Sequence, residues 1–268
     1  MALPSCYREA IAAYARRVGI KNIERETAQL SETYRTGKNS EWLRDERKIA
    51  AYLIARAPAT YAAIRKALVW TKAALPSFSP RSLLDAGAGP GVASWAAAES
   101  FAGISSLQLL ECNPLLAAAA RELSQGQEEF SAARIETSAI ETANLPAADL
   151  VLLSYVAAEW DETVLARNLV KLWDATKGVL LIAEPGTPAG FARILACRAM
   201  LLRLGARIVA PCTSPNTCPL TGPDWCHFAA RLPRSRAHMH AKAARVPFED
   251  EKFSYLAAAR ETIAVSPP

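Results

Sequence analysis

The sequence predicts an α/β fold in which a mostly parallel sheet follows an N-terminal helical region. From residue 81 onward, short apolar runs alternate with helical stretches, and this alternation is typical of a parallel sheet covered on both faces. Before residue 75 the chain is rich in Ala, Leu, Arg, Lys and Glu, with apolar residues at helical spacing. A length of 268 residues with 51% hydrophobic and 21% charged residues is a globular composition, which excludes disordered and collagen-like proteins.

The N-terminal region is expected to be helical over residues 5–74. Its expected breaks are Gly19, Gly37 and Pro58, and Ser40 followed by Glu41 and Trp42 resembles a helix start. A Pro- and Ser-rich stretch over 75–80 predicts a linker. We therefore divide the chain into a helical region, 1–76, and an α/β domain, 77–268.

The α/β domain is expected to begin with a regular succession of strands and helices. Strands are predicted over 82–86, 107–111, 134–137, 149–155 and 178–184, and helices over 92–101, 114–123, 162–174 and 188–204. Residues 205–268 break this rhythm, because they hold three cysteines, all three histidines and the strand-like runs 227–232 and 252–259. Within them, 205–245 is a Cys/His-rich segment.

Charge is distributed unevenly along the chain. Residues 1–80 carry a net charge of +7, residues 81–226 carry −5, and residues 227–268 carry +3. Basic ends favour a polyanionic partner, although solvated helix faces are the simpler alternative.

Targeting and membrane signals are not apparent in the sequence. No apolar run reaches the 18 or more residues of a membrane span, and the first residues contain no apolar core of a secretory signal. A cytoplasmic protein with no membrane partner is therefore expected.

A glycine-rich turn follows the first predicted strand and opens the next helix. It contains Gly87, Gly89 and Gly91, and glycines allow the backbone to approach a ligand while the helix presents free N–H groups. Glu111 ends the second strand, where a carboxylate can accept both hydroxyls of a ribose. Asp85, just before the turn, could orient a positively charged ligand group. The alternative is a tight turn without a ligand.

This combination resembles the class I S-adenosylmethionine-dependent methyltransferases, whose Rossmann-like fold the resemblance implies. It further implies that S-adenosylmethionine is bound by Asp85, Gly87, Gly89, Gly91, Glu111 and Ser154. Of these, Ser154 lies in the usual catalytic motif at the end of the fourth strand. Amino-directed members carry two prolines and an aromatic residue there, whereas this chain reads Ser154-Tyr155-Val156. The sequence therefore identifies no catalytic base and leaves open whether the protein is an enzyme.

Three cysteines lie in a proline-rich stretch with the spacing C-x5-C-x7-C-H: Cys212, Cys218 and Cys226, followed by His227. Since no export signal is visible, metal ligation is favoured over disulfides. Zinc sites usually contain a C-x2–4-C pair, which is absent, and wider spacing suits an iron–sulfur cluster. Three unrelated thiols are the alternative.

Further motifs sharpen the resemblance, which covers roughly residues 40–260. They lie at 184–191, 209–212, 218–220, 224–228, 234–236 and 248–255. The sequence is similar to the methyltransferase-like proteins of the mitochondrial small ribosomal subunit and their bacterial relatives. This resemblance implies a role in small-subunit assembly, binding of ribosomal RNA, and a four-iron–four-sulfur cluster with Cys212, Cys218 and Cys226 as its first three ligands.

The resemblance places the fourth cysteine beyond the Phe253-Ser254-Tyr255 motif, where this sequence shows none. His227, His238 and His240 are the nearby candidates, and zinc on three cysteines and one histidine is the alternative metal.

A basic strip follows the cysteine segment. Its residues Arg231, Arg234 and Arg236 could contact RNA phosphates, although the acidic run 249–251 could instead pair with them. No DNA partner is expected. Two other functions remain open: a non-catalytic RNA-binding assembly factor with a vestigial cofactor site, and a small-molecule methyltransferase with a structural zinc.

Overall fold

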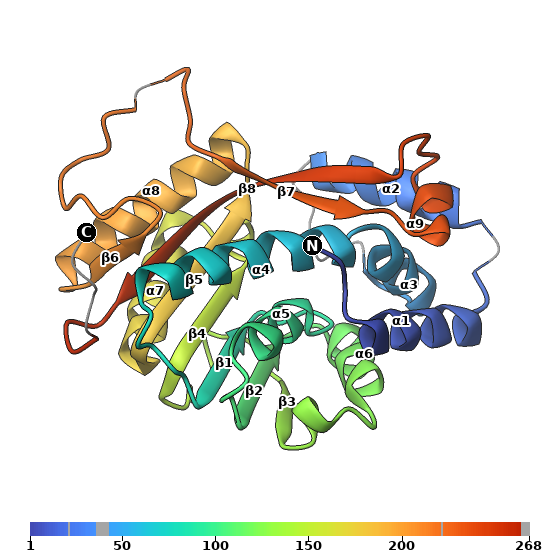
Figure 1. Ribbon diagram of the computed structural model, residues 1–268, viewed down its shortest axis with the longest axis horizontal. Helices are drawn as coiled ribbons and strands as arrows, with labels where there is room; N and C mark the ends of the chain where they lie inside the picture. The colour runs from blue at the N-terminus through green and yellow to red at the C-terminus, as the bar shows by residue number, and fades with distance from the viewer. Residues whose placement is uncertain (21, 36–42, 221, 264–268) are drawn as a thin grey trace.

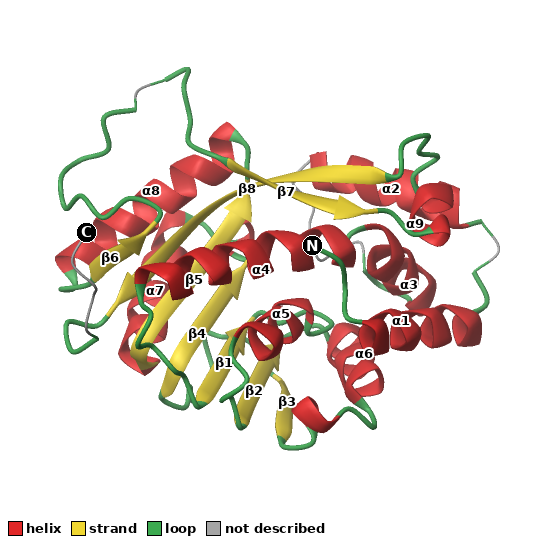
Figure 2. Cartoon of the chain, in the orientation of Figure 1, coloured by secondary structure: helices red, strands yellow, loops and turns green. Residues whose placement is uncertain are grey.

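A single eight-stranded sheet forms the centre of the molecule (Figures 1 and 2). The computed structural model describes residues 1–20, 22–35, 43–220 and 222–263. The strands are β1 (Ser82–Ala86), β2 (Ser106–Glu111), β3 (Ala133–Thr137), β4 (Ala148–Ser154), β5 (Thr176–Pro185), β6 (Arg207–Ala210), β7 (Phe228–Pro233) and β8 (Phe248–Ala259). The helices are α1 (Ser5–Val18), α2 (Ile23–Arg35), α3 (Glu46–Ala55), α4 (Ala57–Ala74), α5 (Val92–Ser100), α6 (Pro114–Ser124), α7 (Glu162–Ala175), α8 (Pro188–Arg203) and α9 (Arg236–Ala241), with 3-10 turns η2 (Glu128–Phe130) and η3 (Ala157–Glu159).

The strand order is β3-β2-β1-β4-β5-β8-β6, with β7 alongside β8. Strands β1 to β5 are parallel, and β8 is inserted antiparallel between β5 and β6. β1 pairs with both β2 and β4, so β2 and β3 are added on one side of β1 whereas β4 and β5 are added on the other. Open α/β sheets bind ligands beside such a switch point, at the carboxyl ends of the strands.

Two hydrophobic cores cover the two faces of the sheet. Successive residues of a strand point to opposite faces, and Leu83 accordingly lies in the core beneath α4 and α5, whereas Leu84 lies in the core beneath α7 and α8. The predicted strands and helices of residues 82–204 are all confirmed, with ends that differ by one or two residues.

The N-terminal helices pack against the sheet domain. Gly19 ends α1 in the left-handed conformation, and the Asp45 side chain caps α3 by accepting a hydrogen bond from the Lys48 N–H at 3.0 Å. Tyr7 of α1 stacks on Trp95 of α5, with ring centroids 4.5 Å apart. The expected helix start at Ser40 and the expected break at Gly37 lie outside the described residues.

The chain after α8 departs from the alternating pattern, as expected. β7 and the first half of β8 form an antiparallel ribbon that extends past the end of β5 toward α9 (Figure 1). Between β6 and β7, the part of the loop that is described contains neither helix nor strand. In the described portion of the chain, no helix combines the length and the apolarity that crossing a membrane requires.

Candidate functional site: a pocket at the carboxyl ends of the parallel strands

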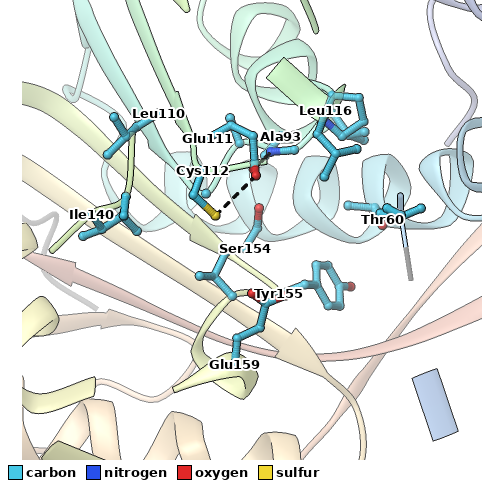
Figure 3. A pocket seen from close by; sticks show the side chains of 18 of the residues that line it. Thr60, Ala93, Leu110, Glu111, Cys112, Leu116, Ile140, Ser154, Tyr155 and Glu159 are labelled. Carbon is cyan, nitrogen blue, oxygen red and sulfur yellow. Dashed lines mark hydrogen bonds between the residues drawn. The ribbon is translucent and has the colours of Figure 1, made fainter. Parts of the chain in front are cut away.

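A pocket opens where the carboxyl ends of β1, β2, β3 and β4 meet the N-terminal helices (Figure 3). The loops after these four strands form most of its wall, and Leu43, Tyr52 and Thr60 close it from the N-terminal region. Of the residues predicted to bind a cofactor, the structure brings Gly87, Gly89, Glu111 and Ser154 together in this wall. Because these residues lie at or just after the carboxyl ends of β1, β2 and β4, the pocket lies at the switch point of the sheet.

The glycine turn presents its backbone to the pocket without side chains between them. Gly87 has φ +71°, and a Cβ atom there would lie 2.4 Å from Val156 Cγ2. Gly89 has φ +55°, but a Cβ atom there would meet no protein atom within 4 Å. The backbone at Gly89 thus faces open space, which suits close approach of a ligand.

Glu111 connects the end of β2 to this turn. Its Oε2 accepts a hydrogen bond from the Gly89 N–H at 2.7 Å, and its Oε1 accepts one from the Asn113 N–H at 2.8 Å. Only 6% of the residue is exposed. Burial raises the pKa of Glu111, and the two N–H groups partly oppose that rise by stabilising the carboxylate.

The charged residues that line the pocket are all acidic. They are Glu111, Glu141 and Glu159, and neither Lys nor Arg lines the pocket among the described residues. Such a wall favours a ligand that carries positive charge and disfavours a phosphate group.

Asp85 lies beneath the pocket and does not line its wall. It is fully buried; the Ser94 hydroxyl donates a hydrogen bond to its Oδ2 at 2.7 Å, whereas its Oδ1 has no partner among the described residues. Burial raises the pKa of Asp85 to about 7.

Several lining residues were not identified from the sequence. Glu141 follows β3 and accepts a hydrogen bond from Asn168 Nδ2 at 2.7 Å. Tyr155 follows Ser154 with φ +61°, an uncommon conformation for a side chain of this size. Tyr52 and Thr60 belong to the N-terminal helices, and no local pattern in those helices indicates contact with a pocket.

The three cysteines of the β6–β7 loop border a second cavity, between that loop, α8 and β8. Cys212, Cys218 and Cys226 all line it, together with apolar side chains such as Phe191. Burial raises the pKa of the Cys226 thiol, and the nearby Cys218 and Cys212 raise it further. Across the described residues, however, no three His, Cys, Asp or Glu side chains are arranged to hold a metal ion.

The three histidines that could complete such a site differ in their surroundings. His238 Nε2 lies 3.2 Å from Glu249, and His240 Nδ1 lies 3.1 Å from Glu24. His227 stacks on Trp225, and its Nδ1 is buried without a partner among the described residues. His227 is therefore the histidine left available beside Cys226.

The predicted RNA-binding arginines are mostly engaged within the protein. Arg231 makes a two-point contact with Asp250, at 2.8 and 2.7 Å, and Arg234 lies 3.2 Å from Glu249. Arg236 is exposed and takes part in none of the ion pairs found among the described residues.

Comparison with solved structures defines the class of fold. The chain is similar to the plantazolicin methyltransferase BpumL in complex with SAH, at 12% identity and a TM-score of 0.51, over 90% of this chain and 100% of that one. It is also similar to the magnesium protoporphyrin IX methyltransferase ChlM from Synechocystis PCC 6803, at 11% identity and a TM-score of 0.50, over 76% and 84%. The sheet order and these neighbours define a Rossmann-like class I methyltransferase fold, which confirms the predicted fold.

The family follows from the sequence itself. Residues 46–268 match the family described as mitochondrial small ribosomal subunit Rsm22, and the chain belongs to this family. Two curated relatives, the Rsm22-cox11 tandem proteins 1 and 2 of Schizosaccharomyces pombe, are each 28% identical over 193 residues, or 65% of this chain. The chain spans about a quarter (26%) of the length of these relatives.

These relatives contradict the cytoplasmic localisation expected from the sequence, because the family and both curated relatives are described as mitochondrial. That expectation rested on the lack of a secretory signal. Mitochondrial transit peptides are amphipathic and Arg-rich and have no apolar core of that kind, so its absence says nothing about import into mitochondria.

Proposed function

We propose that the protein binds S-adenosylmethionine in the pocket at the carboxyl ends of β1 to β4 and acts with the small ribosomal subunit, through its RNA, in assembly or translation. One observation supports the cofactor above all: a buried carboxylate, Glu111, is held at the pocket wall by the N–H groups of Gly89 and Asn113. The chain's family supports the ribosomal partner.

The residues present fit this cofactor. The open space beside Gly89 leaves room for a ligand against the backbone, and Glu111 offers carboxylate oxygens to the hydroxyls of a ribose. Glu141 and Glu159 add negative charge that suits a sulfonium and an ammonium group. When bound, S-adenosylmethionine supplies an activated methyl group.

Any methyl transfer would depend on how the pocket places an acceptor. Ser154 and Tyr155 line it at the end of β4, and orientation of a nucleophile by such residues is the main contribution they can make. Burial raises the pKa of Tyr155 well above its ordinary value, so this phenol stays protonated near neutral pH and does not serve as a base. We name no other general base.

Calorimetric titration of the purified protein with S-adenosylmethionine tests the cofactor, with Gly89→Arg as the variant that fills the pocket. Wild-type binding that Gly89→Arg abolishes, with the same circular dichroism spectrum, is expected. A folded wild-type protein that does not bind would overturn the assignment. Co-sedimentation with small subunits tests the partner, and recovery of the protein only in the fraction that contains no subunits would overturn it.

The same variant distinguishes the alternatives. If cells that carry Gly89→Arg still assemble small subunits, the protein acts as an RNA-binding factor whose cofactor site is dispensable. If the wild-type protein binds S-adenosylmethionine but binds ribosomal RNA no more tightly than random RNA, with weak salt dependence, a small-molecule methyltransferase is favoured.

The cysteine loop supports a second, separate proposal: Cys212, Cys218 and Cys226 hold an iron–sulfur cluster, or zinc as the alternative. The three thiols border one cavity, but their arrangement is not that of a ligand set, so binding requires the loop to draw them together. Iron, sulfide and zinc analysis of anaerobically purified protein, with Cys218→Ser as the variant, tests this. If the wild-type protein contains metal and Cys218→Ser does not, the result supports this proposal. If the wild-type protein contains no metal, the proposal is overturned.

A further inference from the structure

A groove between α1, α3 and the β7–α9 segment carries a concentration of positive charge outside the cofactor pocket. Its charged lining residues are Arg8, Arg16, Arg234 and Arg236, and His238 also lines it. No Asp or Glu is among the described residues that line this groove. The groove therefore disfavours cations and favours an anionic partner.

Three of these arginines are available to such a partner. Arg8, Arg16 and Arg236 are exposed, and the ion pairs found among the described residues do not involve them. Arg234, in contrast, is held by Glu249 at 3.2 Å. The available charge of this region thus lies across two separate elements, α1 and α9, and only one of its members belongs to the basic strip predicted from the sequence.

The spacing of the arginines indicates a polymer. Arg8 and Arg16 are eight residues apart on α1, which places them about 12 Å apart along the helix axis. One phosphate group cannot bridge that distance, whereas a chain of phosphates can contact both. Guanidinium groups bind phosphates in a two-point geometry, which matches the expected contact.

The floor of the groove is apolar. Ala12 is exposed and Ala15, Ile54 and Pro58 are half-buried, so these apolar residues present accessible surface to the groove that they line. An apolar floor between arginines suits unstacked bases, because bases present flat faces that pack on apolar surfaces and on guanidinium planes. An acidic peptide would match the charge but would gain less from this floor.

We propose that this groove binds single-stranded RNA, with Arg8, Arg16 and Arg236 on the phosphates and the apolar floor beneath the bases. The inference rests on the proposed ribosomal function and names the surface that contacts RNA. Arg8 and Arg16 lie before residue 46, outside the part of the chain that matches the family, so this surface combines the N-terminal extension with the family domain.

The test uses fluorescence anisotropy of a labelled twelve-nucleotide single-stranded RNA against the full chain over a salt series. The variant is Arg8→Gln/Arg16→Gln/Arg236→Gln. The matched control, Arg134→Gln/Arg167→Gln/Arg203→Gln, makes the same change of charge at exposed positions on β3, α7 and α8. Thermal unfolding checks that both variants fold.

We expect the groove variant to bind about tenfold more weakly at moderate salt, with a slope of log affinity against log salt shallower by about 2, since each lost contact to single-stranded nucleic acid removes about 0.7. The control should bind as the wild type does. Equal loss in both variants, or no loss in the groove variant, would overturn the proposal. Displacement of the RNA by a polyglutamate peptide of equal charge and at equal concentration would also overturn it, in favour of an acidic protein partner.

These outcomes separate this inference from the proposed function. If the wild-type protein binds small subunits and RNA but the groove variant does so equally well, only the placement of the RNA surface fails. If the wild-type protein binds no RNA, both this placement and the RNA contact in the proposed function fail.

Discussion

The Gly89 N–H donates a hydrogen bond to Glu111 Oε2 at 2.7 Å, which links the glycine turn after β1 to the carboxyl end of β2. The two residues are 22 positions apart in sequence, and they meet because β1 and β2 are parallel neighbours whose ends coincide. This contact fixes the turn and the carboxylate relative to each other before any ligand arrives.

Removing the charge of Glu111 should weaken cofactor binding. Glu111→Gln keeps the shape of the side chain but replaces charge-assisted hydrogen bonds to the ribose, each of about 1.5–3 kcal/mol, by neutral ones. It also turns an NH2 group toward one of the two N–H donors, Gly89 or Asn113. We expect calorimetry to show that S-adenosylmethionine binds the variant at least about tenfold more weakly than it binds the wild-type protein. Glu129→Gln, at an exposed position of η2, should bind normally; equal affinity in the two variants would show that Glu111 does not contact the ligand.

Gly89→Ala should separate backbone strain from loss of the site. Gly89 and Gly126 both have positive φ, at +55° and +71°, and a Cβ atom at either would meet no protein atom within 4 Å. Each alanine should cost about 1–2 kcal/mol of unfolding free energy in urea. Only Gly89→Ala should lower S-adenosylmethionine affinity, by about tenfold or more, and an equal effect of Gly126→Ala would argue against ligand contact at Gly89.

Asp85 should make stability depend on pH. Burial raises its pKa to about 7, so the native state holds a proton that the unfolded state releases near pH 4. The stability linked to this proton is fully present below about pH 4 and is lost as pH rises to about 7. Asp85→Asn should reduce the decline of unfolding free energy over this range by up to about 1.4 kcal/mol per pH unit.

Urea unfolding at several pH values measures this dependence. Asp174→Asn, at an exposed position of α7, is the matched control and should leave the slope unchanged. An unaltered slope in Asp85→Asn would show that the carboxyl ionises normally. Glu184 contributes in the same direction, because burial also raises its pKa to about 7, so some decline should remain in the variant.

Glu249 should stabilise the β7–β8 ribbon above acidic pH. Burial opposes its charge, but the His238 side chain at 3.2 Å and a hydrogen bond from Lys242 outweigh burial and lower the pKa of Glu249. The stability it supplies is therefore present at neutral pH and is lost as pH falls through the acid range. Glu249→Gln should cost about 1–3 kcal/mol at pH 7, and less at pH 3.

Asp250→Asn is the control for this effect. Asp250 follows Glu249 on β8 and pairs with the exposed Arg231 of the neighbouring strand β7, and exposed pairs contribute little. Asp250→Asn should therefore lower the free energy of unfolding in urea at pH 7 by clearly less than Glu249→Gln does. A loss from Asp250→Asn as large as that from Glu249→Gln would place the stabilising charge on the outer side of the ribbon.

Much of the fold and part of the candidate site could be predicted from local sequence. The central strands β1, β4 and β5 are apolar because both faces of the sheet are covered, and the glycines at 87, 89 and 91 mark a turn in which all three have positive φ. The acid at the end of β2 follows from the same pattern. Each of these features is encoded within a few neighbouring residues.

The remaining features depend on contacts between distant segments. Tyr52 and Thr60 reach the pocket only because α3 and α4 pack over it. Arg231 contacts Asp250 because the register of β7 and β8 places them opposite each other. From the sequence, pairing with the acidic run 249–251 was only the alternative to a contact with RNA.

The position of β8 has a consequence for synthesis of the chain. This strand lies between β5 and β6 and also pairs with β7, yet it is made after all three. While the nascent chain leaves the ribosome, β5 and β6 each keep an unpaired edge until residue 259 has emerged. Such edges promote association between incomplete chains. Completion of the sheet thus has to wait for β8, and a truncation before β8 should produce aggregates rather than a smaller folded protein.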